Sequence, residues 1–350
     1  MDEGAHAAGG EAGPGGVATW MDDSVRASVQ ARVLHEAMAL RRVPAGALYA
    51  SPFQALRWLA LHEAWSPARR DAGVLQAYDE VFGDLAERLE DGPWVLASLG
   101  CGGGQKEERF LSRAHRRPES ALVVDVSPSL ALGSHDRVSR WCPTHAGVMD
   151  LEVASGPSRW CEALMRCGAL GARCTRVVTL LGMLPNMDLA HARRVLEAWT
   201  APGDWVVLSA NLASEDECMR GLRTILPQYD NEETRRWLSG FLEWQGIRAG
   251  SFGWEYGVER LPSGEGGMAR ITVDAVLREP ACVQVPGQEG VRWAAGERVR
   301  VFQSLRMTLD AARQFGTSMG WRVVRAAADA RGEEGVVLLQ RLEGVGERGE

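Results

Sequence analysis

The sequence predicts an α/β protein built on a doubly wound parallel sheet, and two observations lead to this prediction. Five short apolar runs have the length and composition of strands that are buried on both faces. They cover residues 94–99, 121–126, 146–149, 177–181 and 205–209. Segments with helical spacing lie between them, at 105–111, 158–170 and 188–199. Short apolar strands that alternate with helices form parallel sheets covered on both sides.

Further elements are expected on either side of this core. Before it, apolar residues recur at helical spacing over 22–40, 52–62 and 72–89. After it, the patterns predict helices at 215–226, 232–245 and 309–319, and strands at 271–277, 298–304 and 335–340. We expect the last two strands to return to the sheet as an antiparallel pair.

These patterns divide the chain into four parts. Residues 1–17 are rich in Gly, Ala and Glu and are expected to form a disordered tail, because they cannot bury enough apolar surface to order themselves. Residues 18–93 should supply N-terminal helices that cover the site. Residues 94–213 and 300–345 should form the core, and 214–299 an inserted α+β region that binds substrate.

Composition excludes several classes of function. The net charge of the 350 residues is −7 with no basic block, which argues against a nucleic-acid partner. No apolar run reaches the roughly 18 residues that a membrane span needs. The seven cysteines contain no Cys-x-x-Cys pair, and the histidines lack metal-ligand spacing, so we expect free thiols and no metal. A cytoplasmic monomer or homodimer fits best.

The first core strand ends in a glycine-rich turn, Leu-Gly-Cys-Gly-Gly-Gly-Gln-Lys at 99–106. Glycines let a backbone approach a nucleotide closely, and three ligand chemistries compete for such a turn. A P-loop needs Ser or Thr after its lysine, where this chain has Glu107. A dinucleotide fold needs a third glycine where this chain has Gln105. S-adenosylmethionine has no pyrophosphate to hold, and its requirements fit the turn best.

Two aspartates follow the next strands. Asp125 ends the second core strand, where a carboxylate can accept hydrogen bonds from both ribose hydroxyls of a nucleotide. Asp150 ends the third, where the adenine amino group is expected. Each could instead serve as a helix cap.

Several segments, in order over residues 45–341, resemble the histidine-specific methyltransferase family of ergothioneine biosynthesis, whose members methylate amino-acid α-amino groups. The turn at 99–106 resembles its Leu-Gly-Ser-Gly-x-x-x-Lys, and Asp-Val-Ser-Pro-Ser at 125–129 its Asp-Ile-Ser-Pro-Ser. Residues 180–186 resemble its Leu-Gly-Ser-x-x-Gly-Asn element, and 229–230 its Tyr-Asp. The segments at 48–49, 63–69 and 295–304 resemble its Tyr-Asp, Glu-Tyr-Tyr-Pro-Thr-Arg and Ala-Gly-Glu elements.

The resemblance implies a Rossmann-like class I methyltransferase core with S-adenosylmethionine as cofactor. It implies that Asn186 and Tyr229 hold the α-carboxylate and amine of the substrate and act in catalysis. The implied cofactor contacts are Tyr49, Gly100, Cys101, Gly102, Lys106, Asp125, Asp150 and Gly182. The implied substrate pocket also contains Trp65, Ser66, Met183, Phe302 and Ser304.

Three of these positions differ from the family pattern. Phe302 stands where the family has the glutamate of its imidazole-reading pair, Met183 stands in place of a serine, and Ser66 in place of a tyrosine. A phenylalanine cannot accept the imidazole N–H, and an unpaired buried donor is costly. We therefore expect a methyltransferase (EC 2.1.1 class) that acts on the α-amino group of an amino acid or derivative other than histidine. The alternatives are a histidine Nα-methyltransferase, a catalytically silent cofactor-binding module and a nicotinamide oxidoreductase.

Overall fold

The computed structural model describes residues 17–342 apart from 155, 166–173, 214–224 and 262–266. Its largest element is an eight-stranded sheet of order β1-β4-β3-β2-β5-β6-β13-β12. The strands are β1 (Thr19–Met21), β2 (Trp94–Leu99), β3 (Ser120–Asp125), β4 (Thr144–Val148), β5 (Thr175–Leu181), β6 (Trp205–Asn211), β12 (Trp321–Ala328) and β13 (Glu334–Arg341). The strands from β1 to β6 pair in parallel, and β13 runs antiparallel to both of its neighbours.

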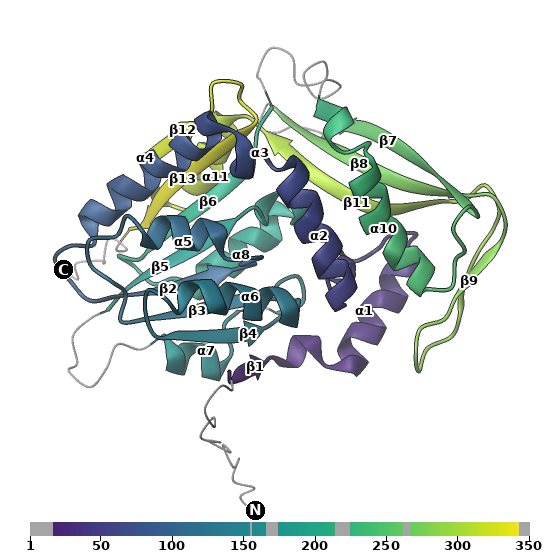
Figure 1. Ribbon diagram of the computed structural model, residues 1–350, viewed down its shortest axis with the longest axis horizontal. Coiled ribbons are helices and arrows are strands. Elements are labelled where there is room, and N and C mark those ends of the chain that lie inside the picture. Colours follow the sequence, from purple (N-terminus) through teal and green to yellow (C-terminus); the bar gives the residue numbers. More distant parts are fainter. Residues whose placement is uncertain (1–16, 155, 166–173, 214–224, 262–266, 343–350) are drawn as a thin grey trace, which may run out of the picture.

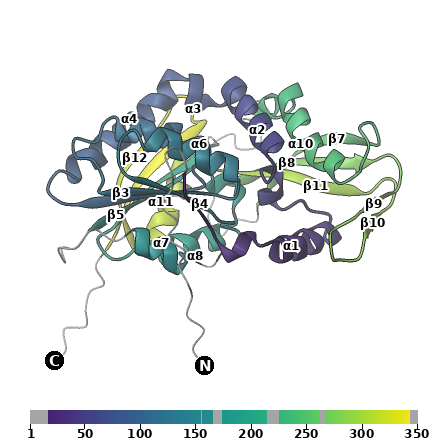
Figure 2. The ribbon, with the colours of Figure 1, turned by 60° about the horizontal axis from the view of Figure 1, so that its bottom comes forward.

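Helices cover both faces of this sheet, so the doubly wound fold is confirmed (Figures 1 and 2). One face packs against α4 (Ala72–Arg88), α5 (Gln105–Leu111) and α6 (Pro128–Val138), and the other against α7 (Arg159–Leu164), α8 (Leu189–Trp199) and α11 (Leu309–Ser318). Because successive side chains of a strand point to opposite faces, Leu96 belongs to one apolar core and Ala97 to the other. This two-sided burial explains why the parallel strands are apolar runs in the sequence.

The chain reverses its direction of progress across the sheet at β2. It runs outward from β2 through β3 to β4, and then crosses to β5 on the other side of β2. Such a reversal opens a crevice at the carboxyl ends of the two strands, and ligands of open α/β sheets bind there.

A second unit stands beside the carboxyl ends of the large sheet (Figure 1). It contains a three-stranded antiparallel sheet of order β11-β8-β7, formed by β7 (Phe252–Arg260), β8 (Met268–Leu277) and β11 (Arg298–Met307). The helix α10 (Glu232–Trp244) places Trp237 and Phe241 in an apolar core that also contains Val273 and Val301. The short strands β9 (Ala281–Val283) and β10 (Val291–Trp293) pair with each other, and Met38 of α1 (Ala27–Ala39) belongs to the same apolar core.

The end of this second unit differs from the prediction. The strand expected at 298–304 was assigned to the large sheet, but β11 pairs with β8 along its length. The antiparallel pair of the large sheet is formed by β13 and β12, and β12 was not predicted. The second unit thus runs on to Met307, whose carbonyl accepts a hydrogen bond of 2.9 Å from Ala213 N, just past the end of β6. This contact fastens the two sheets together.

The N-terminal helices have two different placements. α2 (Pro52–Trp65) packs against α10 and lies between the two units (Figure 1). It begins after Ser51, whose hydroxyl accepts a hydrogen bond of 3.2 Å from Gln54 N. The short helices η1 (Asp23–Val25), η2 (Ala45–Leu48) and α3 (Pro67–Arg70) connect the longer ones, whereas α4 packs on the large sheet. The expected tail at 1–16 and the helical segments at 166–170 and 215–224 lie outside the described residues.

Three findings concern membranes, metals and thiols. No helix among the described residues is long and apolar enough to cross a membrane. Over those residues, no group of three or more His, Cys, Asp or Glu side chains could hold a metal ion. The thiols of Cys101, Cys142, Cys161 and Cys282 are free, but Cys174 is disulfide-bonded, so the expectation of free thiols is wrong at that position.

Candidate active site

A cavity of about 450 Å³ opens at the carboxyl ends of β2 and β5, bounded by the large sheet, α2 and the second unit. Every residue that the sequence predicted for cofactor and substrate lines this one cavity. They are Tyr49, Trp65, Ser66, Gly100, Cys101, Gly102, Lys106, Asp125, Asp150, Gly182, Met183, Asn186, Tyr229, Phe302 and Ser304. The structure therefore brings together residues that lie up to 255 positions apart in the chain.

The glycine turn between β2 and α5 forms the floor of the cavity. Gly100, Gly102 and Gly104 have φ angles of +64°, +52° and +74°, a region that other residues rarely enter. A Cβ on Gly104 would lie 2.8 Å from the Cα of Ser134, and one on Gly100 would lie 2.3 Å from Sδ of Met183. The turn thus needs glycine both for its backbone and for its close packing.

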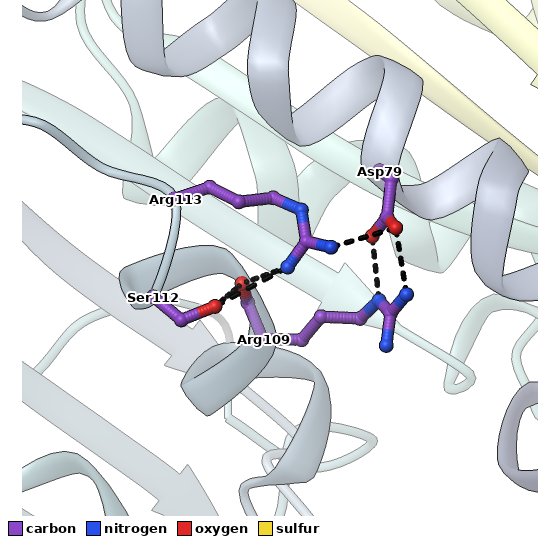
Figure 3. A network of polar contacts seen from close by, with 4 residues as sticks. All are labelled: Asp79, Arg109, Ser112 and Arg113. Carbon is purple, nitrogen blue, oxygen red and sulfur yellow. Dashed lines mark hydrogen bonds and ion pairs between the residues drawn. The ribbon is translucent and has the colours of Figure 1, made fainter.

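An ion-pair cluster holds the helix that follows the turn (Figure 3). Asp79 of α4 accepts hydrogen bonds of 2.6 and 2.7 Å from Nε and Nη2 of Arg109 in α5. The same carboxylate lies 2.6 Å from Nη2 of Arg113. Nη1 of Arg113 donates to Ser112 Oγ at 3.2 Å. Two arginines, one on α5 and one just past its end, therefore share one carboxylate on α4, and this fixes α5 behind the turn.

Asp125 fixes a carboxylate beside the same turn. It ends β3, and it accepts hydrogen bonds from Gly102 N (3.0 Å) and Ser127 N (2.9 Å), one on each carboxylate oxygen. Only 6% of the residue is exposed, and this burial raises its pKa to about 6, although the backbone N–H groups oppose the rise. Each oxygen keeps a further lone pair with which it could accept from a ligand.

Asp150 lies in the same cavity but has protein partners of its own. Gln30 Nε2 donates to its Oδ2 at 2.8 Å, and its backbone N–H donates to Ser24 Oγ at 3.0 Å. Burial raises its pKa. Four apolar side chains near the two aspartates in the sequence also line the cavity, namely Val126, Leu130, Met149 and Leu151. This combination makes a slot with two acidic groups and hydrophobic sides.

Lys106 is neutralised within the protein. Its Nζ lies 3.1 Å from Oε1 of Glu334 and 4.8 Å from the ring centre of Tyr78. The Tyr78 hydroxyl donates to the same Glu334 carboxylate. A Cβ on Gly182 would lie 3.4 Å from the Lys106 amine, so these two predicted cofactor contacts lie close together. Through its ion pair with Glu334, Lys106 links the start of α5 to the start of β13.

Aromatic rings form the wall that faces the turn. Tyr49 packs against Trp58 and Trp237 with ring centres 5.8 and 5.5 Å away, and Trp237 packs against Phe302 at 5.6 Å. Trp237 is buried, and its indole N–H donates to the carbonyl of Leu48 at 3.1 Å. Burial raises the pKa of Tyr49, which keeps this phenol protonated. A planar or cationic ligand is suited to such a wall.

Trp65 occupies a different place from the other aromatic residues. It is 43% exposed, and its indole N–H donates to Glu233 at 3.0 Å. It therefore lies at the rim of the cavity.

A chain of polar side chains forms the end of the cavity. Tyr229 O–H donates to Ser304 Oγ at 3.3 Å, and Asn211 Nδ2 donates to the same oxygen at 3.0 Å. Arg306 Nη2 donates to the Tyr229 hydroxyl at 2.8 Å. The predicted residues Tyr229 and Ser304 thus bond to each other, and each also accepts from a residue that the sequence did not single out.

Asn186 and His62 also line the cavity. Asn186 ends η3 (Leu184–Asn186), and its side-chain amide makes no hydrogen bond to any described residue, whereas its backbone N–H donates to the Met183 carbonyl at 2.9 Å. The His62 ring lies 4.0 Å from that of Trp58, and burial, together with the charges of Lys106 and Arg69, lowers its pKa to about 3. Its imidazole is therefore neutral over the physiological range.

Sequence reasoning missed five of these residues, which are His62, Trp58, Asn211, Trp237 and Arg306. Only Arg306 carried a signal, since it follows Ser304 by two positions, just past the end of the strand predicted at 298–304, and a longer strand would place both on one face. The others reach the cavity through tertiary packing, which no local pattern reveals.

No protein-family model and no curated protein matches the sequence. Structures with the same broad architecture include a magnesium protoporphyrin IX methyltransferase from Synechocystis with bound S-adenosylhomocysteine (TM-score 0.40, 12% identity, covering 83% of this chain and 95% of that one). Another is a 1,6-didemethyltoxoflavin-N1-methyltransferase from Burkholderia thailandensis (TM-score 0.38, 12% identity, 84% and 92% covered). A third is an S-adenosylmethionine-dependent methyltransferase from Leishmania major (TM-score 0.39, 10% identity, 84% and 86% covered). Likenesses of this size leave the function to be argued from the site.

Proposed function

We propose that this chain is an S-adenosylmethionine-dependent methyltransferase that acts on a small molecule. The observation that carries the proposal is the Asp125 carboxylate, which is held beside the glycine turn at the point where the strand order reverses. Acidic groups at this position accept hydrogen bonds from the hydroxyls of a ribose. The cavity continues from there to an aromatic wall, which leaves room for a second ligand beside the nucleoside.

The residues present fit this cofactor. Asp125 would accept from the ribose diol, and the apolar slot with Asp150 suits a purine that carries an amino group. The rings of Tyr49 and Trp58 suit a sulfonium, because aromatic faces attract cations. When bound, the cofactor supplies an electrophilic methyl group. The protein then has to position the acceptor and exclude water, which are the main demands of such a transfer.

Phosphate-binding functions suit the turn less well. Glu107 and Glu108 occupy the first turn of α5, and Glu107 is 2% exposed. Burial raises the pKa of Glu107, whose carboxyl accepts a hydrogen bond of 2.8 Å from Ser98 Oγ. Acidic side chains at this point disfavour the pyrophosphate of a dinucleotide or the phosphates of a nucleoside triphosphate.

For the acceptor, we propose the α-amino group of an amino acid or derivative other than histidine. The free amide of Asn186 and the hydroxyl of Tyr229 supply polar contacts of the kind that an amino acid needs. Phe302 packs between Tyr229 and Trp237 and offers no acceptor to an imidazole N–H. The short segments that resemble the amino-acid methyltransferase family favour the same acceptor.

Two measurements test this function in turn. Calorimetric titration of the full chain with S-adenosylhomocysteine should show one site per chain, and titration with NAD should show none. Transfer of a labelled methyl group to each of the twenty amino acids should then identify the acceptor. Absence of S-adenosylhomocysteine binding would overturn the cofactor proposal. Binding without transfer to any amino acid or derivative would favour a silent module, and methylation of histidine would overturn the narrower acceptor.

A further inference from the structure

Arg306 places a guanidinium in the wall of the cavity, although the residue is only 4% exposed. Nη1 donates to the backbone carbonyls of Leu212 and Glu333, each at 3.1 Å, and Nη2 donates to the Tyr229 hydroxyl at 2.8 Å. Nε is buried and has no hydrogen-bond acceptor. A guanidinium carries five N–H groups, so part of the donor capacity of Arg306 remains unused.

The unused donor belongs to the edge of the guanidinium that binds carboxylates elsewhere in this chain. Three other arginines direct Nε and Nη2 together at one carboxylate. They are Arg41 with Glu297 (3.0 Å for both bonds), Arg109 with Asp79 (2.6 and 2.7 Å) and Arg300 with Asp274. In Arg306 the same edge meets one tyrosine hydroxyl and no carboxylate.

The nearby acidic side chains are engaged with other groups. The Glu334 carboxylate pairs with Lys106 and Tyr78, and the Glu333 carboxylate accepts from Gln228 Nε2 at 3.3 Å. Within the part of the chain that the structure describes, Arg306 therefore has no anionic partner. A buried charge without a counter-charge is costly, and such charges are normally paired. Because Arg306 lines the cavity, a ligand can supply the missing charge.

We propose that Arg306 binds a carboxylate of the methyl acceptor and so restricts the site to acids. The inference rests on the proposed function and deepens it, because it names the acceptor class. The planar edge of a guanidinium matches a carboxylate with two parallel hydrogen bonds. In the structure, Arg306 Nη2 on this edge donates to the Tyr229 hydroxyl. When the carboxylate binds, that N–H would donate to the carboxylate instead, and the Tyr229 O–H would lie beside the carboxylate as a further donor. Neutral amides would leave the charge of Arg306 uncompensated.

Matched acids and amides test this inference on the full chain saturated with S-adenosylhomocysteine. The probes are L-phenylalanine and L-phenylalaninamide, L-tryptophan and L-tryptophanamide, and phenylacetate and phenylacetamide, each titrated by calorimetry. We expect at least one acid to bind about ten- to a hundredfold more tightly than its amide, because charge-assisted hydrogen bonds are the strong ones. Arg306→Met should bring each acid to within about threefold of its amide.

Two further variants serve as a control and as a second test. Arg313→Met removes an exposed arginine of α11 and should leave the preference unchanged. Arg306→Lys keeps the charge without the planar edge, and its affinity for the acid should fall about tenfold. This variant also provides the test if Arg306→Met does not fold. Equal binding of acids and amides, no binding of any acid, or an undiminished preference in a folded Arg306 variant would overturn the inference. S-adenosylhomocysteine binding is the separate measurement that decides the proposed function.

Discussion

Single side chains decide what the cavity can bind, and Asp125 is the residue on which the cofactor proposal depends most. Asp125→Asn keeps one acceptor oxygen for the turn but removes the negative charge and the second acceptor. We expect the affinity for S-adenosylhomocysteine to fall by about 1.5–3 kcal/mol in calorimetry, the range for hydrogen bonds to a charged group. Asp188→Asn is the matched control, because asparagine caps helix α8 as well as aspartate does. Unchanged affinity in the Asp125 variant would contradict the ribose role.

The raised pKa of Asp125 adds a pH dependence with a definite sign. In the proposed site the ionised carboxylate accepts from the ribose, so we expect the affinity for S-adenosylhomocysteine to decline as pH falls through about 6, by at most tenfold per pH unit. The stability of the ligand-free protein should respond in the opposite direction. Burial favours the protonated acid, so the cost of burying the carboxylate is full above pH 6 and declines as pH falls from about 6 towards the ordinary pKa of 3.8. Glu152, whose pKa is raised to about 7, lines the same cavity and also titrates. The Asp125 contribution is therefore the part of the pH profile that disappears in Asp125→Asn.

Without the family resemblance, the local pattern predicts the candidate site only where its functional groups lie in consecutive residues. Gly100, Gly102 and Asp125 lie where one strand ends and a turn begins, so their positions follow from the local pattern. Asn211 gains its role by meeting Ser304 of the other sheet, and Arg306 by meeting Tyr229, which lies in the turn before α10. A pattern within one strand cannot encode a meeting of that kind.

At the scale of elements, the glycine turn and helix α4 offer opposite responses to the same substitution. Gly104→Ala would place a Cβ 2.8 Å from the Cα of Ser134 at a φ of +74°, and backbone cannot move aside cheaply. We expect it to lower the free energy of unfolding in urea by about 1–3 kcal/mol. Gly83→Ala in α4 meets no atom within 4 Å and should raise it by roughly 0.5–1 kcal/mol. A loss at both positions would show that the helix also depends on its glycine.

The pairing between α4 and α5 should contribute modestly to stability. The side chains of Asp79, Arg109 and Arg113 are 29–32% exposed, so solvent weakens their attraction. Asp79→Asn should lower the free energy of unfolding by about 1 kcal/mol or less, and the effect should shrink in high salt. Asp84→Asn, which breaks a single i,i+4 pair with Arg88, should cost only about 0.3 kcal/mol. If Asp79→Asn lowered the free energy of unfolding no more than Asp84→Asn does, sharing one carboxylate between two arginines would add no stability beyond that of a single ion pair.

The strands that the sequence predicted differ in burial from those that it missed. β2 to β6 lie inside the large sheet, and both faces of these strands are covered, so they stand out as apolar runs. β12 is an edge strand that carries Arg322 and Arg325, and β1 has three exposed residues. β7 is the edge of the smaller sheet. An edge strand buries less apolar surface, so its pattern resembles that of a loop.

For the molecule as a whole, the cavity lies where two separately packed units meet. The large sheet contributes the glycine turn and the acidic residues, while α10 and β11 contribute Trp237, Phe302 and Arg306. The units are joined where β6 ends, through Leu212, Ala213 and Met307. A ligand that fills only one end of the cavity should therefore stabilise one unit more than the other.

Hydrogen exchange can separate the two halves of the site. S-adenosylhomocysteine at about a hundred times its dissociation constant should stabilise the native state by about 2.7 kcal/mol, because it binds only the folded form. Local slowing should centre on 99–106, 125–130 and 149–151, the segments around the turn and the two aspartates. Adding phenylacetate to that complex should slow exchange in 226–237 and 302–307, because Tyr229 and Arg306 lie there. The contrary outcome is that S-adenosylhomocysteine slows exchange in the second unit and leaves exchange in 99–106 unchanged. That result would contradict the assignment of the cofactor to the glycine turn and of the acceptor to the second unit.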